Sequence, residues 1–200
     1  MDIKLKGTRI HVLREQSGET RVLGLAGSKS NLTPVFPAHI HIEDASILWE
    51  DRKHGGVELN LDKVDLHLSS RNQRMHLEIT APQHKLLFRS ELEGNILGSA
   101  WSANSYLQTS ELEARPFASA YLPEEYILDK LQLGLESWSK WRDGRHVATQ
   151  AKLKLHQLEL RHTEGSRLTL DSASTQMQFR RDHDHWQLPF SDFSVDSSKG

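Results

Sequence analysis

The chain has 200 residues, no cysteine and a formal net charge of −2, with 25 basic and 27 acidic residues. The absence of cysteine excludes a disulfide framework and a thiolate site, and the even scatter of charge argues against a nucleic-acid-binding surface. Apolar residues form 36% of the chain, below the ~45–50% usual for globular proteins. No run of about 18 apolar residues is present, and the first six residues lack the pattern of a signal peptide.

Turn signals divide the chain into segments in which apolar and polar residues alternate, as they do in strands. We predict strands at 2–14, 20–26, 38–51, 57–69, 73–80, 84–93, 99–109, 130–142, 146–162, 166–180 and 185–196. The segment 147–162 would run roughly 50 Å, since a strand rises about 3.3 Å per residue. One short helical insertion is predicted at about 116–129, where apolar residues come close to helical spacing and Pro116 suits the first turn.

One spacing recurs six times: two apolar residues two positions apart, a step of three, and two more positions two apart. Leu59, Leu61, Val64 and Leu66 show it, and the other examples begin at Ile3, Ile40, Leu153, Leu168 and Leu188, with Ala or Thr as stand-ins at some positions. On a helix the four positions would scatter around the axis. On a strand they share one face if an extra residue is inserted between the pairs, as in a β-bulge.

The spacing therefore predicts an all-β protein, a long and twisted antiparallel β-meander of bulged strands with one apolar face. An apolar face must lie against something, and one short helix cannot cover so many strands. The sheet must close into a barrel, fold over as a sandwich, or leave a groove that another apolar molecule fills. Patterning alone leaves open a small-ligand barrel, a structural sandwich and a groove.

Chemical motifs are weak. We find no Gly-x-Ser-x-Gly elbow, no His-Glu-x-x-His helix and no defined carboxylate pair, so we expect no enzymatic activity and no cofactor. His39-x-His41 and the run 182–185 could seat a metal, but the first pair lies opposite Ile40 and Ile42, where solvated histidine is expected. We therefore predict no metal site. Trp138 and Trp141 are expected to pack within the sheet or at its edge.

Several segments resemble the YhdP branch of the AsmA-like proteins. They are 45–51 (ASILWED), 106–117 (YLQTSELEARPF) continuing to Pro123, 134–144 (GLESWSKWRDG) and 151–160 (AKLKLHQLEL). The resemblance extends from about residue 38 to the end, and the Trp-x-x-Trp-x-x-Gly stretch is its most specific part.

This resemblance implies a periplasmic β-groove that conducts phospholipid between the inner and outer membranes of a Gram-negative envelope, in a protein anchored to the inner membrane. It implies phospholipid as the partner, with no nucleic acid, and it leaves envelope protein partners unidentified. We expect residues 1–200 to be a single β-groove segment, an internal fragment of a larger repeated protein. The predicted lipid-binding residues lie on the apolar faces of three segments: Ile40, Ile42, Ala45, Ile47, Trp49, Leu59, Leu61, Val64, Leu66, Leu153, Leu155, Leu158 and Leu160.

Overall fold

A computed structural model describes residues 2–17, 20–23, 38–54, 56–72, 74–94, 100–119, 122–182 and 185–196. Its strands are β1 (Asp2–Lys6), β2 (Arg9–Arg14), β3 (Thr20–Leu23), β4 (His39–Asp51), β5 (Val57–Arg71), β6 (Arg74–Ala81), β7 (Leu86–Gly94), β8 (Trp101–Glu113), β9 (Tyr126–Arg142), β10 (Arg145–His162), β11 (Arg167–Leu170), β12 (Ser172–Asp182), β13 (His185–Gln187) and β14 (Phe190–Asp196). Two 3₁₀ turns, η1 (Arg52–His54) and η2 (Pro82–His84), and one helix, α1 (Arg115–Ser119), join them.

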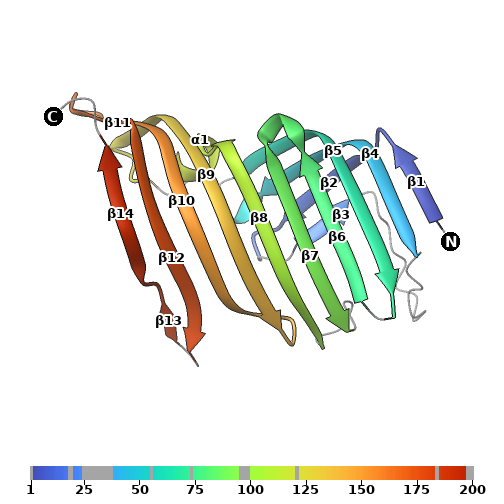
Figure 1. Ribbon diagram of the computed structural model, residues 1–200. Helices are drawn as coiled ribbons and strands as arrows, with labels where there is room; N and C mark the ends of the chain where they lie inside the picture. The colour runs from blue at the N-terminus through green and yellow to red at the C-terminus, as the bar shows by residue number, and fades with distance from the viewer. Residues whose placement is uncertain are drawn as a thin grey trace.

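All described strands belong to one 14-stranded sheet (Figure 1). From β4 to β12 each strand pairs with its neighbours antiparallel, with β11 pairing β10 and β14 pairing β12, whereas β1 and β2 run parallel to β4. The strand order ends at β3 on one side and at β13 on the other, and these ends do not pair within the described part of the chain. The sheet is therefore open and single-layered there, unlike a closed barrel or a two-sheet sandwich.

The all-β prediction is confirmed, and most strand boundaries agree within a few residues. The helical insertion predicted at about 116–129 was too long, because α1 ends at Ser119 and β9 already begins at Tyr126. Residues 126–133 instead pair with β10, starting with Tyr126 opposite His162, so hydrogen bonding to a long neighbour outweighs the weak helical spacing. Three predicted strands are also divided in two: 2–14 at Gly7 and Thr8, 166–180 at Asp171, and 185–196 at Leu188 and Pro189.

The recurring spacing marks kinks in the strands. In four of the six examples the residue just before the second apolar pair has a positive φ: Gly7 at 68°, Asp44 at 53°, Lys63 at 53° and Asp192 at 52°. In the example that begins at Leu153, the pairing register shifts between Leu155 and Gln157. In the example that begins at Leu168, the strand breaks at Asp171. A left-handed residue adds one position to the strand, which returns the second apolar pair to the first pair's face.

Kinks in neighbouring strands lie side by side. The Gly7 amide donates to the Glu43 carbonyl oxygen at 2.9 Å, and the Asp44 amide donates to Asp65 Oδ1 at 3.0 Å. Beside the kink Ala45 pairs with Val64. A line of kinks thus crosses β1, β4 and β5, and bends this half of the sheet.

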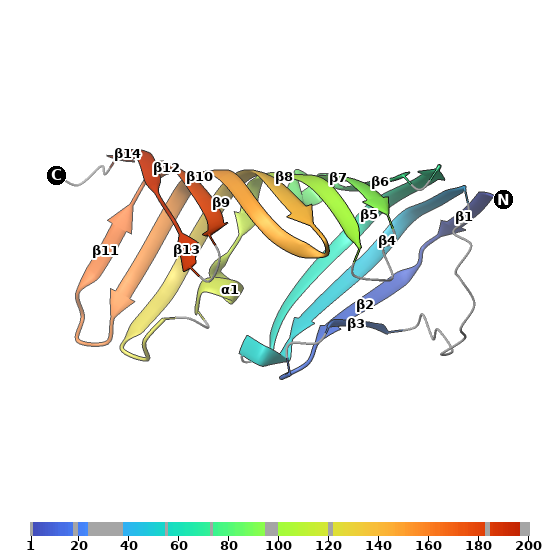
Figure 2. The same cartoon turned by 90° about the horizontal axis from the view of Figure 1, so that it is seen from below.

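A second line of irregularities crosses the other half. Strand β8 shifts register between Thr109 and Leu112, and β10 shifts between Leu155 and Gln157. Leu133 of β9 lies opposite both Leu112 and Leu155, so the two register shifts occur at the same position along the strands. Viewed from below, the two halves slope away from the middle strands, with α1 between them (Figure 2).

The pairing registers define two faces. We call the face that carries the partners Leu66 and Ile79 the inner face, because α1 packs on it through Ala118. The outer face carries their neighbours, such as the paired His67 and Glu78, and is mostly polar. Two apolar clusters lie on the inner face, one over β4 to β6 around Val64 and one over β9 and β10 around Leu131.

We expect the left-handed kink at Lys63 to be sensitive to side-chain shape. Lys63→Val should lower the free energy of unfolding by about 1–2 kcal/mol, because a β-branched residue is strained at positive φ, whereas Lys63→Gly should be neutral or stabilising. Urea denaturation followed by tryptophan fluorescence measures both. The matched control, Asp62→Val on the adjacent exposed position, should cost no more than about 0.5 kcal/mol; equal losses at 62 and 63 would contradict the kink's role.

Candidate functional site

The thirteen residues predicted to bind lipid all lie on the inner face. Eight belong to the cluster over β4 and β5: Ile40, Ile42, Ala45, Ile47, Leu59, Leu61, Val64 and Leu66. Leu155, Leu158 and Leu160 belong to the cluster over β9 and β10. Trp49 pairs with Leu59, and Leu153 with Leu135, which extends each group along the same face. The structure therefore gathers them into two groups on the two sloping halves of the sheet.

The inner face has no second layer in the described part of the chain apart from α1 and its flanking loop. The accessible surface is 13820 Å², against roughly 9,600 Å² for a compact protein of 22.9 kDa. Val64 is the only bulky side chain that is fully buried among the described residues. At the β14 edge the apolar side chains are open to solvent, with Phe193 at 75% exposure and Phe190 at 60%. An apolar face exposed to this extent marks a binding surface.

A row of hydroxyl groups crosses the middle of the inner face, which the sequence analysis missed. Ser90, Ser105, Ser139 and Thr149 lie opposite one another on β7, β8, β9 and β10. Ser90 and Ser105 share a hydrogen bond of 2.9 Å, and Ser139 and Thr149 share one of 2.7 Å. Paired hydroxyls satisfy each other and leave little cost of burial. The middle strands therefore carry one row of small hydroxyl-bearing side chains on this face, with larger apolar side chains such as Phe88 and Leu107 beside it.

Beside the hydroxyl row the inner face carries a chain of aromatic rings. Trp101 contacts Trp141, Trp141 contacts His146 and His146 contacts Phe179, with ring centroids 5.9, 5.1 and 5.5 Å apart. Trp138 lies instead on the outer face against Tyr106. Residues three apart on a strand point to opposite faces, and this parity is the signal that would have separated the two tryptophans of the Trp-x-x-Trp motif.

His146 is the titratable group most clearly affected by this environment. Burial among the rings lowers its pKa from the ordinary value of 6.5, and a backbone hydrogen bond with Ala148 opposes that effect. Its Nε2 lies 2.7 Å from Thr149 Oγ1, at the end of the hydroxyl row. The imidazole is therefore held toward its neutral form, which suits an apolar surface.

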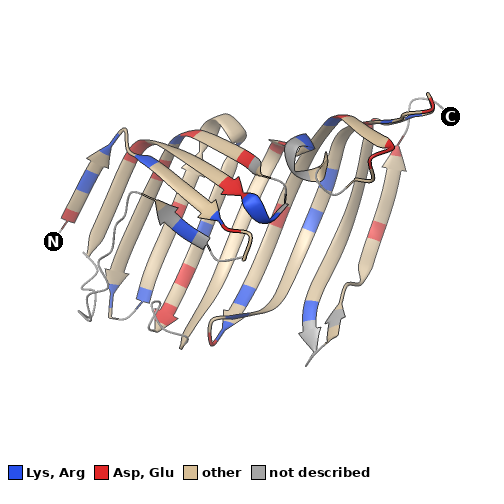
Figure 3. Ribbon diagram, turned by 180° about the vertical axis from the view of Figure 1, so that it is seen from behind, with Lys and Arg blue, Asp and Glu red and all other residues tan. Residues whose placement is uncertain are grey.

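The outer face is polar and its charges are paired across strands. Lys4 lies 2.8 Å from Glu43, Arg89 lies 2.7 Å from Glu78, and Arg74 lies 2.7 Å from Glu93. Acidic and basic positions are both spread over the strands of the sheet (Figure 3). Such exposed pairs contribute little stability, about 0–1 kcal/mol each, and they keep this face hydrated.

Of the two runs that could seat a metal, the structure describes only the first in full. His39 and His41 lie on the outer face, where the His41 ring stacks on His67 with centroids 3.8 Å apart. The run 182–185 includes residues outside those described. No group of three or more metal-ligating side chains converges among the described residues.

The sequence matches the YhdP protein family over residues 3–200. The chain belongs to this family. No curated protein and no solved structure matched it. Among the described residues, no helix has the length and apolar character needed to cross a bilayer. The resemblance noted in the segments from residue 38 onward is thus part of a match that covers almost the whole chain, including β1 and β2.

We expect His146 to make stability depend on pH. Because its folded-state pKa is lowered, the unfolded chain binds the proton more tightly, and stability should fall as the pH drops below about 6.5. In His146→Phe, whose ring fits the aromatic chain, the unfolding midpoint should fall less between pH 7 and pH 5. Urea denaturation at each pH tests this. Between pH 8 and pH 7 the unfolding midpoint should change with pH equally in the wild type and in the variant. An unchanged slope between pH 7 and pH 5 would contradict the assignment.

Proposed function

We propose that the chain binds the acyl chains of phospholipids on its inner face and forms part of a path for lipid between the inner and outer membranes of a Gram-negative envelope. The observation that carries this proposal is an apolar face that spans an open sheet and that, among the described residues, only α1 and its flanking loop cover in part. The thirteen predicted residues are its binding surface. The periplasm is the proposed compartment, with the full-length protein held at the inner membrane.

The chemistry of the face suits acyl chains. Each methylene group removed from water contributes about 0.8 kcal/mol, so an acyl chain laid along the aliphatic walls replaces the missing layer of a normal core. The half-buried side chains that border the two clusters, such as Leu59 and Leu158, offer that surface. A phospholipid can keep its headgroup in water because the sheet does not close over it.

The family assignment supports the same function. A long sheet with one apolar and one hydrated face can lie in an aqueous compartment while it carries apolar cargo. Such transport needs no catalytic group, in line with the expectation that the chain is not an enzyme. Movement along the face needs no cofactor, since lipid exchanges one apolar contact for another of similar free energy.

Adding charge to the inner face should abolish lipid retention. Leu59→Glu combined with Leu158→Glu places one carboxylate on each sloping half, where it is costly beside an acyl chain but can still reach water. We expect the double variant to fold and to lose most of the phospholipid that the wild type retains. Organic extraction and mass spectrometry of the purified proteins measure the lipid, and circular dichroism measures the fold.

The matched control is Asn60→Glu combined with Gln157→Glu. These exposed positions adjoin Leu59 and Leu158 on the same strands but lie on the outer face. The control adds the same two charges and should retain lipid at the wild-type level. The proposal fails if the wild type neither carries phospholipid nor takes it up from vesicles, or if the inner-face variant retains lipid as the control does.

A further inference from the structure

A shallow furrow crosses the outer face at right angles to the strands. It consists of two adjoining cavities of about 460 Å³ and 470 Å³, which share Arg89, Ser90 and Glu91 of β7. One cavity extends over β8, β9 and β10 to Arg180 of β12, and the other over β6 and β5 to β4. Eight neighbouring strands therefore contribute to it, a span of roughly 35 Å at about 4.8 Å per strand.

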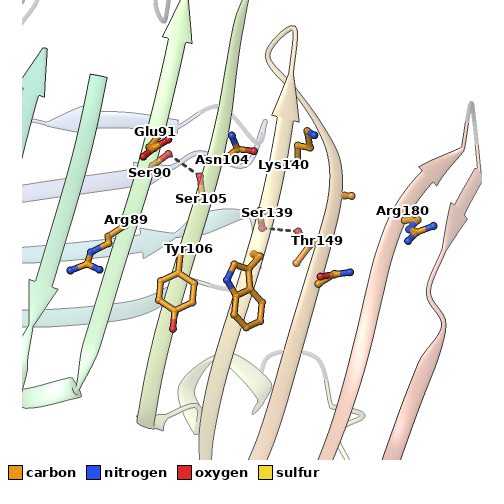
Figure 4. Close-up of a pocket in the computed structure, with 13 residues that line it drawn as sticks. Arg89, Ser90, Glu91, Asn104, Ser105, Tyr106, Ser139, Lys140, Thr149 and Arg180 are labelled. Carbon is orange, nitrogen blue, oxygen red and sulfur yellow. Dashed lines mark hydrogen bonds between the residues drawn. The ribbon is translucent and has the colours of Figure 1, made fainter. Parts of the chain in front are cut away.

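The floor of the furrow is backbone, and its borders are two rows of outer-face side chains. Ser90, Ser105, Ser139 and Thr149 line the first cavity, although their hydroxyl groups belong to the row on the inner face. Tyr106 and Arg89 come from neighbouring strands in one row, and Asn104 and Lys140 belong to the other (Figure 4). The furrow is thus separated from the lipid-binding face by the thickness of the sheet.

Two aromatic rings in the furrow stand out on an otherwise polar face. Tyr106 and Trp138 pair across β8 and β9 with ring centroids 5.4 Å apart, and Trp138 is 40% exposed. Lys152 lies over the Trp138 ring at 5.5 Å from its centroid, and Tyr106 donates a hydrogen bond to Glu136 at 3.0 Å. Exposed aromatic rings surrounded by polar groups give a ligand both a flat apolar surface and hydrogen bonds.

The furrow carries charges of both signs. Arg89 is paired with Glu78 at 2.7 Å, and Glu91 lies 3.7 Å from His76. The remaining border includes the neutral amides of Asn104 and Gln150, and Lys140 and Arg180 add two positive charges at the end of the furrow over β9 and β12. A nucleic acid or a phosphorylated ligand would need a concentration of positive charge, and acyl chains would need a continuous apolar lining. In this furrow the two additional positive charges lie at one end only, and charged and amide side chains interrupt the apolar surface.

We propose that the furrow binds a linear, uncharged polysaccharide. The carbon-bound hydrogens of a pyranose ring form a flat apolar patch that fits the exposed part of the Trp138 ring beside Lys152, while its hydroxyl groups match the mixed donors and acceptors along both borders. The length of the furrow accommodates several sugar residues in an extended chain. This site lies on the outer face, so it does not depend on the lipid proposed for the inner face.

The test uses the purified chain with chitohexaose, a β-1,4-linked N-acetylglucosamine oligomer, in isothermal titration calorimetry. We expect saturable binding whose affinity changes little between 50 and 500 mM salt, because the ligand carries no charge. Trp138→Ala should weaken it about tenfold or more. Gln150 is an exposed residue that borders the cavity, and Gln150→Ala should weaken chitohexaose binding by a smaller factor. This second variant tests the proposal if Trp138→Ala does not fold.

The matched control is Trp141→Phe, which changes the other tryptophan of the same strand on the inner face. It should bind chitohexaose as the wild type does. The proposal is overturned if the wild type shows no binding at millimolar chitohexaose, or if neither Trp138→Ala nor Gln150→Ala weakens binding. It is also overturned if anionic phospholipid vesicles or a polyphosphate compete for Trp138 with strong salt dependence, since the furrow would then be an anion site.

Discussion

A sheet with one apolar face must bury that face, and the described part of this chain supplies little to cover it. The five residues of α1 lie against β9 and part of β5, and Val64 is the only bulky side chain fully buried among the described residues. Backbone hydrogen bonding along very long strands, up to the 18 residues of β10, therefore holds the fold together more than a packed core does. The uncovered inner face, the open edges and the proposed use of lipid as a second layer all follow from this shortage.

The bend of the sheet is a backbone property. Asp44 and Lys63 adopt left-handed conformations on adjacent strands, and the hydrogen bond from the Asp44 amide to Asp65 ties one kink to the next. A single bulge would only distort one strand, whereas bulges at the same level of several strands turn the whole sheet. The two sloping halves then bring the aliphatic clusters toward the same side, with the small hydroxyl-bearing residues of β7 to β10 between them.

Much of this could be predicted from the sequence, because strand patterns with a period of two are local. The spacing of Leu59, Leu61, Val64 and Leu66 indicated both the shared face and the extra residue between the pairs, and the register bears it out. The helix was overestimated because a few apolar residues at helical spacing say little about the hydrogen bonds that Tyr126 makes with a distant strand. The hydroxyl row was missed because it depends on which serines of four strands fall opposite one another. That alignment is a matter of register between strands, and no single segment contains it.

The kinks and the lining of the inner face are encoded by different residues. Gly7, Asp44, Lys63 and Asp192 set the bend through their φ angles, while leucine, isoleucine and valine side chains only need to be apolar and of suitable size. Exchanges among these aliphatic residues alter the surface without altering the curvature, so the lining is free to drift over evolutionary time. The four positions with a positive φ are not free in the same way, since most side chains are disfavoured there. Relatives of this chain should therefore keep the same sheet curvature after the residues that line the inner face have diverged. The spacing of the kinks along the sequence should identify such relatives better than the lining residues do.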